Sequence, residues 1–151
     1  KINILETIKR AVDFYKLSQK GLKLNFNNKS NNILFIKGDS EQLYRVFINL
    51  IKNSIEAIDT KKQKHAKLQG KIDLEIMVDN EYIVIKMLDN GTGFYDIKNI
   101  IKPYFTTKKD GTGLGLPIVT KIINEHNGEI NFVKHSDGAE INISLPIFNE
   151  N

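Results

Sequence analysis

The order of hydrophobic patterns along the chain is the feature that most restricts its fold. Three segments with helical spacing lie near residues 3–19, 39–58 and 115–127, and each is followed by two short segments typical of strands. Strands that come in pairs predict hairpins rather than single crossovers between parallel strands. We therefore expect an α+β fold: a two-layer α/β sandwich in which helices cover one face of a mixed sheet.

The central helix has the clearest pattern. Asp39 is a predicted N-cap, and Gln42 three residues later completes a capping-box arrangement. We expect the helix to run to about Ile58 and a Lys-rich exposed loop to follow over residues 59–70. The apolar stripe of the helix consists of Leu43, Val46, Phe47, Leu50, Ile51 and Ile58. The lysines assigned to the loop are Lys61, Lys62, Lys64 and Lys67.

The strands are predicted from alternation of apolar and polar residues. An Asp79–Asn80 turn should join two of them in a hairpin. The third helix should end at Asn127-Gly128. The six predicted strands are residues 22–27, 33–36, 72–78, 82–88, 129–134 and 139–146.

Composition excludes several classes of site. The 151 residues suit one domain and include no cysteine, which removes disulfides, thiolate metal sites and a cysteine nucleophile. The three histidines lack metal-ligand spacing, so we expect structural or solvated roles for them. The net charge of +4 comes from scattered lysines with only two arginines, so no nucleic-acid binding is expected. The chain begins without Met, and we expect it to be a piece of a longer protein.

Two asparagines on the central helix are candidates for a cation site. Asn49 and Asn53 lie four residues apart, so they share one helical face beside the apolar stripe. An amide oxygen can coordinate Mg²⁺ together with phosphate oxygens and water. Taken alone, the pair is better explained as surface asparagines on a long helix.

The segment Asp89–Gly93 directly follows a predicted strand and reads Asp-Asn-Gly-Thr-Gly. A carboxylate at a strand end can accept a hydrogen bond from a purine amino group. Glycines there let the backbone take positive φ or approach a flat ring closely. The same composition is ordinary turn chemistry, which is the simpler explanation of the segment alone.

A glycine-rich segment, Gly111–Leu116, opens the third predicted helix. Free N–H groups at a helix N-terminus attract anions, and Pro117 suits the first turn. The segment has neither dinucleotide-binding spacing nor the Lys-Ser/Thr of a P-loop, and a flexible linker is the alternative. Upstream, Pro103–Asp110 carries aromatics that can anchor a lid and a lysine, Lys108, that can reach phosphates.

In this order, the segments resemble the ATP-binding domain of bacterial sensor histidine kinases, within the superfamily of gyrase-, Hsp90- and MutL-type ATPases. Residues 39–53 resemble the family's N box, and Asp89–Gly93 its first glycine box. Pro103–Lys108 resembles its F box, and Gly111–Leu116 its second glycine box. The resemblance covers nearly the whole chain, from the first helix to Pro146. It implies a Bergerat-type ATP-binding fold.

The residues of two segments, 53–58 and 104–108, are most similar to those of nitrogen-regulation-type sensor kinases. The resemblance implies ATP and Mg²⁺ as cofactors. Three residues would be catalytic by carry-over. Asn53 would ligate Mg²⁺, Asn49 would assist near the phosphates, and Lys108 would contact the phosphates from the lid.

The resemblance also implies the nucleotide contacts. Asp89 would bind the adenine amino group, with Gly91 and Gly93 flanking the base. The further binding positions, besides Asn53 and Lys108, would be Phe105, Thr106, Gly111, Thr112, Gly113, Leu114, Gly115 and Leu116. Lys52 and Glu56 are additional candidates. We expect residues from about Tyr95 to Gly111 to be mobile without nucleotide.

The partners follow from the same resemblance. The family's acceptor is a histidine on a separate dimerisation domain, and none of His65, His126 and His135 lies in a sequence resembling it. Residues 1–151 would therefore be a single catalytic domain without the phosphoacceptor domain. We expect a cytoplasmic monomer that binds ATP but barely turns it over alone, with a response regulator acting downstream.

Three alternatives stay open. In gyrase-type ATPases a glutamate base occupies the position of Asn49, and an asparagine cannot accept a proton at neutral pH. A protein serine kinase of the anti-sigma-factor type has a related fold and differs from a histidine kinase only in the details of these motifs. The acid stability of the phosphoproduct would distinguish the two. A nucleotide-binding module without chemistry is the third.

Overall fold

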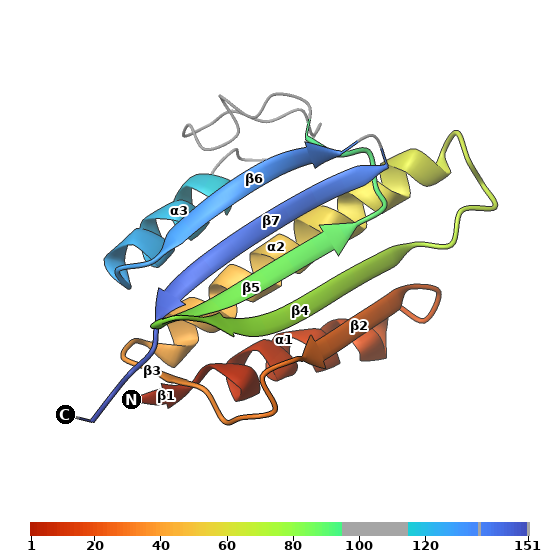
Figure 1. Ribbon diagram of the computed structural model, residues 1–151. Coiled ribbons are helices and arrows are strands. Elements are labelled where there is room, and N and C mark those ends of the chain that lie inside the picture. The colour runs from red at the N-terminus through yellow and green to blue at the C-terminus, as the bar shows by residue number, and fades with distance from the viewer. Residues whose placement is uncertain (95–114, 136, 151) are drawn as a thin grey trace.

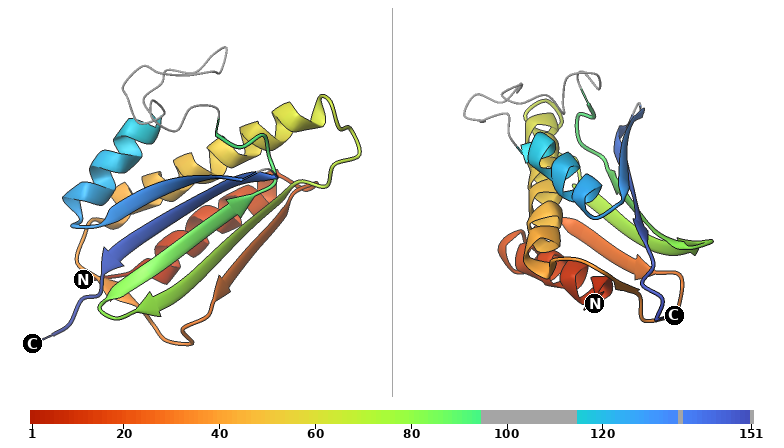
Figure 2. Two further views of the ribbon diagram at one scale, coloured as in Figure 1. Left: turned by 45° about the horizontal axis from the view of Figure 1, so that its top comes forward. Right: turned by 90° about the vertical axis from the view of Figure 1, so that its left-hand side faces the viewer.

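The computed structural model describes residues 1–94, 115–135 and 137–150. Its elements are β1 (Ile2–Asn3), α1 (Ile4–Ser18), β2 (Lys23–Asn28), β3 (Phe35–Ile36), α2 (Ser40–Lys62), β4 (Lys71–Asp79), β5 (Tyr82–Asp89), α3 (Gly115–Glu125), β6 (Glu129–His135) and β7 (Gly138–Pro146). The helices lie on one face of a five-stranded sheet (Figures 1 and 2). The predicted two-layer α+β sandwich is therefore confirmed.

The sheet has the strand order β2-β4-β5-β7-β6. β2 and β4 are parallel, and the other neighbouring pairs are antiparallel, so the sheet is mixed as predicted. The two predicted strands after the first helix do not form a hairpin, however. β3 instead pairs with β1, and β2 pairs with β4 after the chain has crossed over through α2. Local alternation predicts a strand but not its partner, which explains this difference.

The core lies between the helices and the inner face of the sheet. Alternate residues of the central strands are buried against the apolar stripe of α2, and Phe47 is fully buried. α1 is held to α2 by the Tyr15 hydroxyl, which donates to the Ile48 carbonyl at 3.2 Å. The inward residues of β4, β5 and β7 are Ile72, Leu74, Ile76, Ile83, Ile85, Met87, Ala139, Ile141, Ile143 and Leu145.

α2 begins where the sequence predicts and ends later. The Asp39 carboxylate accepts from the N–H groups of Glu41 (2.9 Å) and Gln42 (3.2 Å), which confirms the N-cap. The helix continues to Lys62, four residues beyond the predicted end at Ile58. Ile58 is its last buried residue, so the apolar stripe stops while the polar turn beyond it stays helical.

His126 supplies a contact that the capping-box interpretation assigned to Gln42. Its Nε2 accepts from the backbone N–H of Asp39 at 3.0 Å, and its Nδ1 lies 2.7 Å from the Ile122 carbonyl oxygen. The ring therefore carries its proton on Nδ1, which donates to that carbonyl. This histidine joins the end of α3 to the start of α2, a structural role as expected.

The turns differ from prediction by one or two residues. Asp79 pairs with Tyr82, so the β4–β5 turn is Asn80–Glu81, with Asn80 at φ 54°. α3 ends at Glu125, and Asn127 then takes the left-handed conformation at φ 58°. The position after a helix that glycine usually occupies is thus filled here by asparagine.

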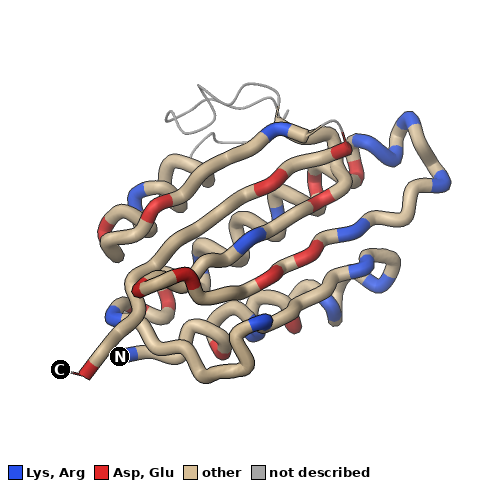
Figure 3. Tube along the Cα trace, in the orientation of Figure 1, with Lys and Arg blue, Asp and Glu red and all other residues tan. Residues whose placement is uncertain are grey.

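Basic and acidic residues both occur along the strands of the sheet (Figure 3). Lys86 lies 3.6 Å from Glu140, and Lys71 lies 3.5 Å from Asp73. In the part of the chain that the structure describes, no helix is both long and apolar enough to cross a membrane.

The N-cap of α2 provides a direct test of this fold. Asp39→Ala removes both capping hydrogen bonds, so we expect the free energy of unfolding in urea to fall by about 1 kcal/mol. Asp39→Ser keeps an acceptor at the cap and should recover most of that loss. Equal destabilisation by alanine and serine would show that the side chain contributes nothing as a cap.

Candidate functional site

The described parts of the predicted site segments meet beside α2. Asn53 is half-buried, and its carboxamide nitrogen lies 3.9 Å from the point that a Cβ on Gly115 would occupy. Gly115 is the first residue of α3. Asn49 is also half-buried and lies one turn earlier on the same face of α2. The predicted N box and the end of the second glycine box are therefore adjacent in space.

Asp89 is the last residue of β5 and is held in place from two sides. The Ser54 hydroxyl donates to Oδ2 at 2.7 Å, and the Gly91 N–H donates to Oδ1 at 2.9 Å. A carboxylate has about four lone-pair positions, so these two bonds, together with one from the Ala139 backbone, leave acceptor capacity for a ligand. The arrangement is a fixed hydrogen-bond acceptor at the end of a central strand, beside α2.

The electrostatics of Asp89 reflect its partial burial. Burial raises the pKa of the Asp89 carboxyl above its ordinary value. Hydrogen bonds from Ser54 and from the backbone of Gly91 and Ala139, together with the charge of Lys61, act in the opposite direction. The carboxylate is thus partly removed from water but surrounded by donors that favour its charged form.

Close packing against neighbouring backbone requires glycine at positions 91 and 93. A Cβ on Gly91 would lie 2.8 Å from the backbone carbonyl carbon of Ala57 and 2.9 Å from the backbone nitrogen of Ile58. Gly93 has φ 78°, and a Cβ there would lie 2.9 Å from the carbonyl oxygen of Gly138. The turn therefore rests directly on the backbone of α2 and on the β6–β7 hairpin. That these glycines flank a base stays a prediction.

Sequence analysis missed two supporting residues of this site. Ser54 lies at a buried position within the apolar stripe of α2, with 2% of its surface exposed. A small polar residue at such a position is the signal that could have identified it, because buried hydroxyls need partners. The Asn90 side chain accepts from the N–H of Lys71 and donates to the carbonyl of Gln69, both at 2.8 Å. It thereby fixes the turn to the start of β4.

The prediction that Lys61 lies in a solvated loop is wrong. Lys61 belongs to the last turn of α2, and its ammonium group donates to the backbone carbonyls of Asn90 at 3.1 Å and Asp137 at 3.4 Å. Lys62 is also helical, whereas Lys64 and Lys67 lie in the exposed segment that follows.

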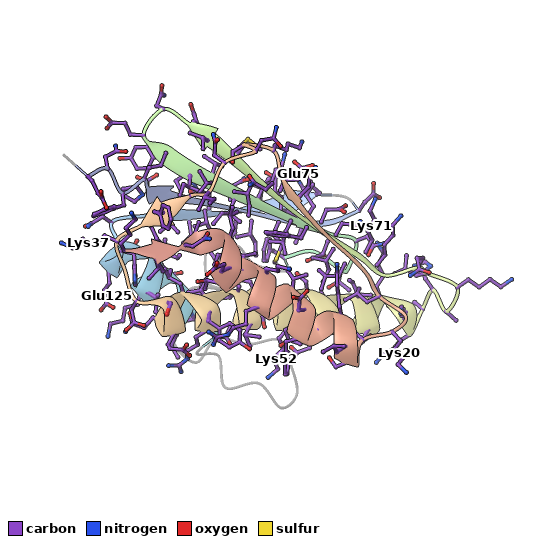
Figure 4. The ribbon with its side chains drawn as sticks, turned by 90° about the horizontal axis from the view of Figure 1, so that it is seen from below. Lys20, Lys37, Lys52, Lys71, Glu75 and Glu125 are labelled. Carbon is purple, nitrogen blue, oxygen red and sulfur yellow. The ribbon has the colours of Figure 1, made fainter. Side chains whose placement is uncertain are left out.

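The other candidates are placed as follows. Leu116 is half-buried in the first turn of α3. The Lys52 ammonium lies 4.0 Å from Glu56, on the outer side of α2 away from the sheet, whereas Lys71 and Glu75 lie on the sheet side (Figure 4). The predicted lid falls outside the described residues. So do the candidates Phe105, Thr106, Lys108, Gly111, Thr112, Gly113 and Leu114.

Comparison with known proteins agrees with this geometry. Residues 38–149 match the family described as histidine kinase-, DNA gyrase B-, and HSP90-like ATPase. Sporulation kinase C of Bacillus subtilis is 36% identical over 124 residues, which are 80% of this chain and 27% of that kinase. A putative NtrY-like sensor histidine kinase of Rickettsia conorii is 31% identical over 97% of this chain and 24% of its own length. The chain thus spans about a quarter of the length of these relatives.

Solved structures show the same architecture. The catalytic domain of histidine kinase ThkA, in a nucleotide-free form, superimposes with a TM-score of 0.80 at 28% identity. The match covers 96% of this chain and 93% of that domain. The mycobacterial sensor histidine kinase MprB, at 19% identity, has the same fold with a TM-score of 0.80.

The raised pKa of Asp89 predicts a pH-dependent cost of folding. The pKa of the Asp89 carboxyl is higher in the folded protein than in the unfolded chain, so protonation of this group stabilises the fold. That stabilisation is fully present at a pH below the unfolded pKa, and it is lost as the pH rises through the folded pKa. Asp89→Asn removes this titration. We expect the variant to be more stable than the parent in urea at pH 7, with the difference shrinking toward about pH 4. A variant that is less stable at pH 7 would contradict this interpretation.

Proposed function

We propose a function from one premise: the chain belongs to the family of histidine kinase-, DNA gyrase B-, and HSP90-like ATPases, and its relatives are sensor histidine kinases. It is an ATP-binding catalytic domain of that kind. From this premise we propose that it binds Mg-ATP with Asp89 on the adenine amino group. We further propose that the γ-phosphate is transferred to a histidine of a separate dimerisation domain.

One observation carries the base assignment. Asp89 presents a half-buried carboxylate whose position is fixed by Ser54 and Gly91 at 2.7 and 2.9 Å. An acceptor fixed before the ligand arrives loses little conformational freedom on binding. It favours a base with an exocyclic amino group over one with a carbonyl, because a carbonyl would face the carboxylate without a hydrogen. Adenine meets this requirement.

The residues around Asn53 fit a phosphate-bound cation. The Asn53 amide is half-buried beside Gly115, at the N-terminus of α3, where backbone N–H groups favour anions. An amide oxygen from the protein, supplemented by phosphate oxygens and water, is a ligand set that suits Mg²⁺. Bound Mg²⁺ would supply neutralisation of phosphate charge. We propose Asn53 as its protein ligand, with Asn49 assisting near the phosphates.

The protein's own part in the transfer is positioning and charge stabilisation. Phosphoryl transfer passes through a loose transition state, so orientation of the phosphates matters more than proton transfer by the protein. The N-terminus of α3 would hold the phosphates, and Lys108 would add a positive charge. We also propose nucleotide contacts for Phe105, Thr106, Gly111, Thr112, Gly113, Leu114 and Leu116.

Asn49 favours transfer over hydrolysis. A hydrolase needs a base to activate water, and an amide side chain cannot accept a proton at neutral pH. Of the alternatives, a gyrase-type ATPase is therefore the least supported. A serine kinase would give an acid-stable phosphoprotein, whereas phosphohistidine is acid-labile.

We propose that the remainder of the signalling protein lies outside these residues. The chain spans about a quarter of its relatives, which leaves room for an acceptor domain and a sensor. The acceptor would be a histidine of the protein's own dimerisation domain. A response regulator would receive the phosphoryl group, and this domain alone would be a monomer that works in the cytoplasm, where ATP is supplied.

Calorimetric titration with ADP and a non-hydrolysable ATP analogue tests the base site. We expect one-to-one binding that Asp89→Asn weakens by at least about tenfold, because a hydrogen bond to a charged group is lost. Asp79→Asn, at the opposite end of β5 in the β4–β5 hairpin, is the matched control and should bind like the parent. Unchanged affinity in Asp89→Asn would remove Asp89 from the base site.

The cation assignment predicts a different signature. Asn53→Ala should abolish the strengthening of ADP binding by Mg²⁺ while leaving metal-free binding within about threefold. Asn124→Ala, on the exposed side of α3, serves as the control. If Asn53→Ala keeps the full Mg²⁺ effect, the ligand lies elsewhere.

The acceptor assignment is tested by labelled ATP. We expect this chain alone to take up almost no label, and acid-labile label to appear on the dimerisation domain when that domain is supplied. Acid-labile phosphorylation of the isolated chain would refute the proposal that the acceptor histidine lies on a separate domain. Acid-stable label would favour the serine-kinase alternative.

A further inference from the structure

Lys61 connects three parts of the structure that are far apart in sequence. From the last turn of α2, its ammonium group reaches the Asn90 carbonyl in the turn after β5 at 3.1 Å. It also reaches the Asp137 carbonyl in the β6–β7 hairpin at 3.4 Å. Its side chain is half-buried. A lysine that ties two backbone segments in this way differs from the solvated lysines around it.

The two segments that Lys61 joins are already in backbone contact. A Cβ on Gly138 would overlap the carbonyl oxygen of Asp89 and lie 3.0 Å from the Cα of Asn90. Asp89 and Ala139 are register partners of β5 and β7. Any shift of the hairpin therefore displaces the main chain that carries the Asp89 carboxylate. Lys61 fastens this contact from the α2 side.

The charge of Lys61 suits this location. Lysine near a helix C-terminus interacts favourably with the helix dipole, and here it also faces two carbonyl dipoles. Its positive charge favours the ionised form of Asp89, in the same direction as the hydrogen bonds from Ser54 and Gly91. A shorter, neutral side chain at position 61 would lack this effect.

We propose that Lys61 is a positioning residue for base recognition: its ammonium group locks the turn 89–93 to the β6–β7 hairpin and so sets the place of the Asp89 carboxylate. Lys61 acts through Asn90 and Asp137 and is not assigned a contact with the nucleotide. This inference rests on the proposed function, because it matters only if Asp89 binds the base. It assigns the choice between amino- and carbonyl-bearing purines partly to a residue outside the predicted boxes.

The experiment compares ADP with inosine diphosphate, whose base carries a carbonyl where adenine carries the amino group. Calorimetric affinities are measured for the parent, Lys61→Gln, Lys61→Arg and the control Lys62→Gln on the same helical turn. We expect Lys61→Gln to lose about tenfold in affinity for ADP, the size expected when one hydrogen bond to a charged group is misplaced. Its affinity for inosine diphosphate should change by less than about twofold. Lys61→Arg should retain the preference for ADP, and Lys62→Gln should match the parent.

The outcomes separate this inference from the proposed function. Equal loss for both nucleotides in Lys61→Gln, with a lowered thermal midpoint, would show a merely structural role and overturn the inference. An unchanged preference for ADP in Lys61→Gln would also overturn it. If the parent bound neither nucleotide, the proposed function itself would fail, whatever the variants did.

Discussion

The contact between the turn after β5 and the backbone of α2 is the constraint on which the site depends. Gly91 lies so close to Ala57 that any side chain there would collide with the helix. The same helix buries its apolar stripe against the sheet, so the packing that forms the core also sets the distance between Asp89 and Asn53. Core substitutions in α2 would therefore disturb binding as well as stability, because protein interiors transmit strain.

Asp89 shows how a charged group can be kept beside a core. Taking a carboxylate partly out of water is unfavourable, and the raised pKa is the sign of that cost. The Ser54 hydroxyl and the Gly91 amide offset part of it and at the same time fix the direction of the carboxylate. A binding group that is already oriented but incompletely hydrated gains more from a matching ligand than a mobile surface aspartate would. The partly buried Asp89 carboxylate thus lowers the stability of the fold but is suited to bind a matching ligand.

Much of the fold could be predicted from local pattern, and the failures share one physical cause. Periodicity identified α1, α2 and α3 and their buried faces, and Asp39 was recognisable as a cap. The pairing of β2 with β4, the His126 contact and the ties made by Lys61 join residues many positions apart. Local sequence carries little information about such pairings. Of the residues that support Asp89 and its turn, Ser54, Asn90 and Lys61 act through neighbouring groups, and their roles were not predicted from the motifs.

A crystal structure of the chain with Mg-ADP is the measurement that tests the central claim most directly. The account predicts the adenine amino group within hydrogen-bond distance of the Asp89 carboxylate, with Ser54 and Gly91 still bonded to the same oxygens. It also predicts the phosphates on the side of Asn53 and the N-terminus of α3. A nucleotide bound elsewhere, or an adenine amino group with no contact to Asp89, would contradict the account.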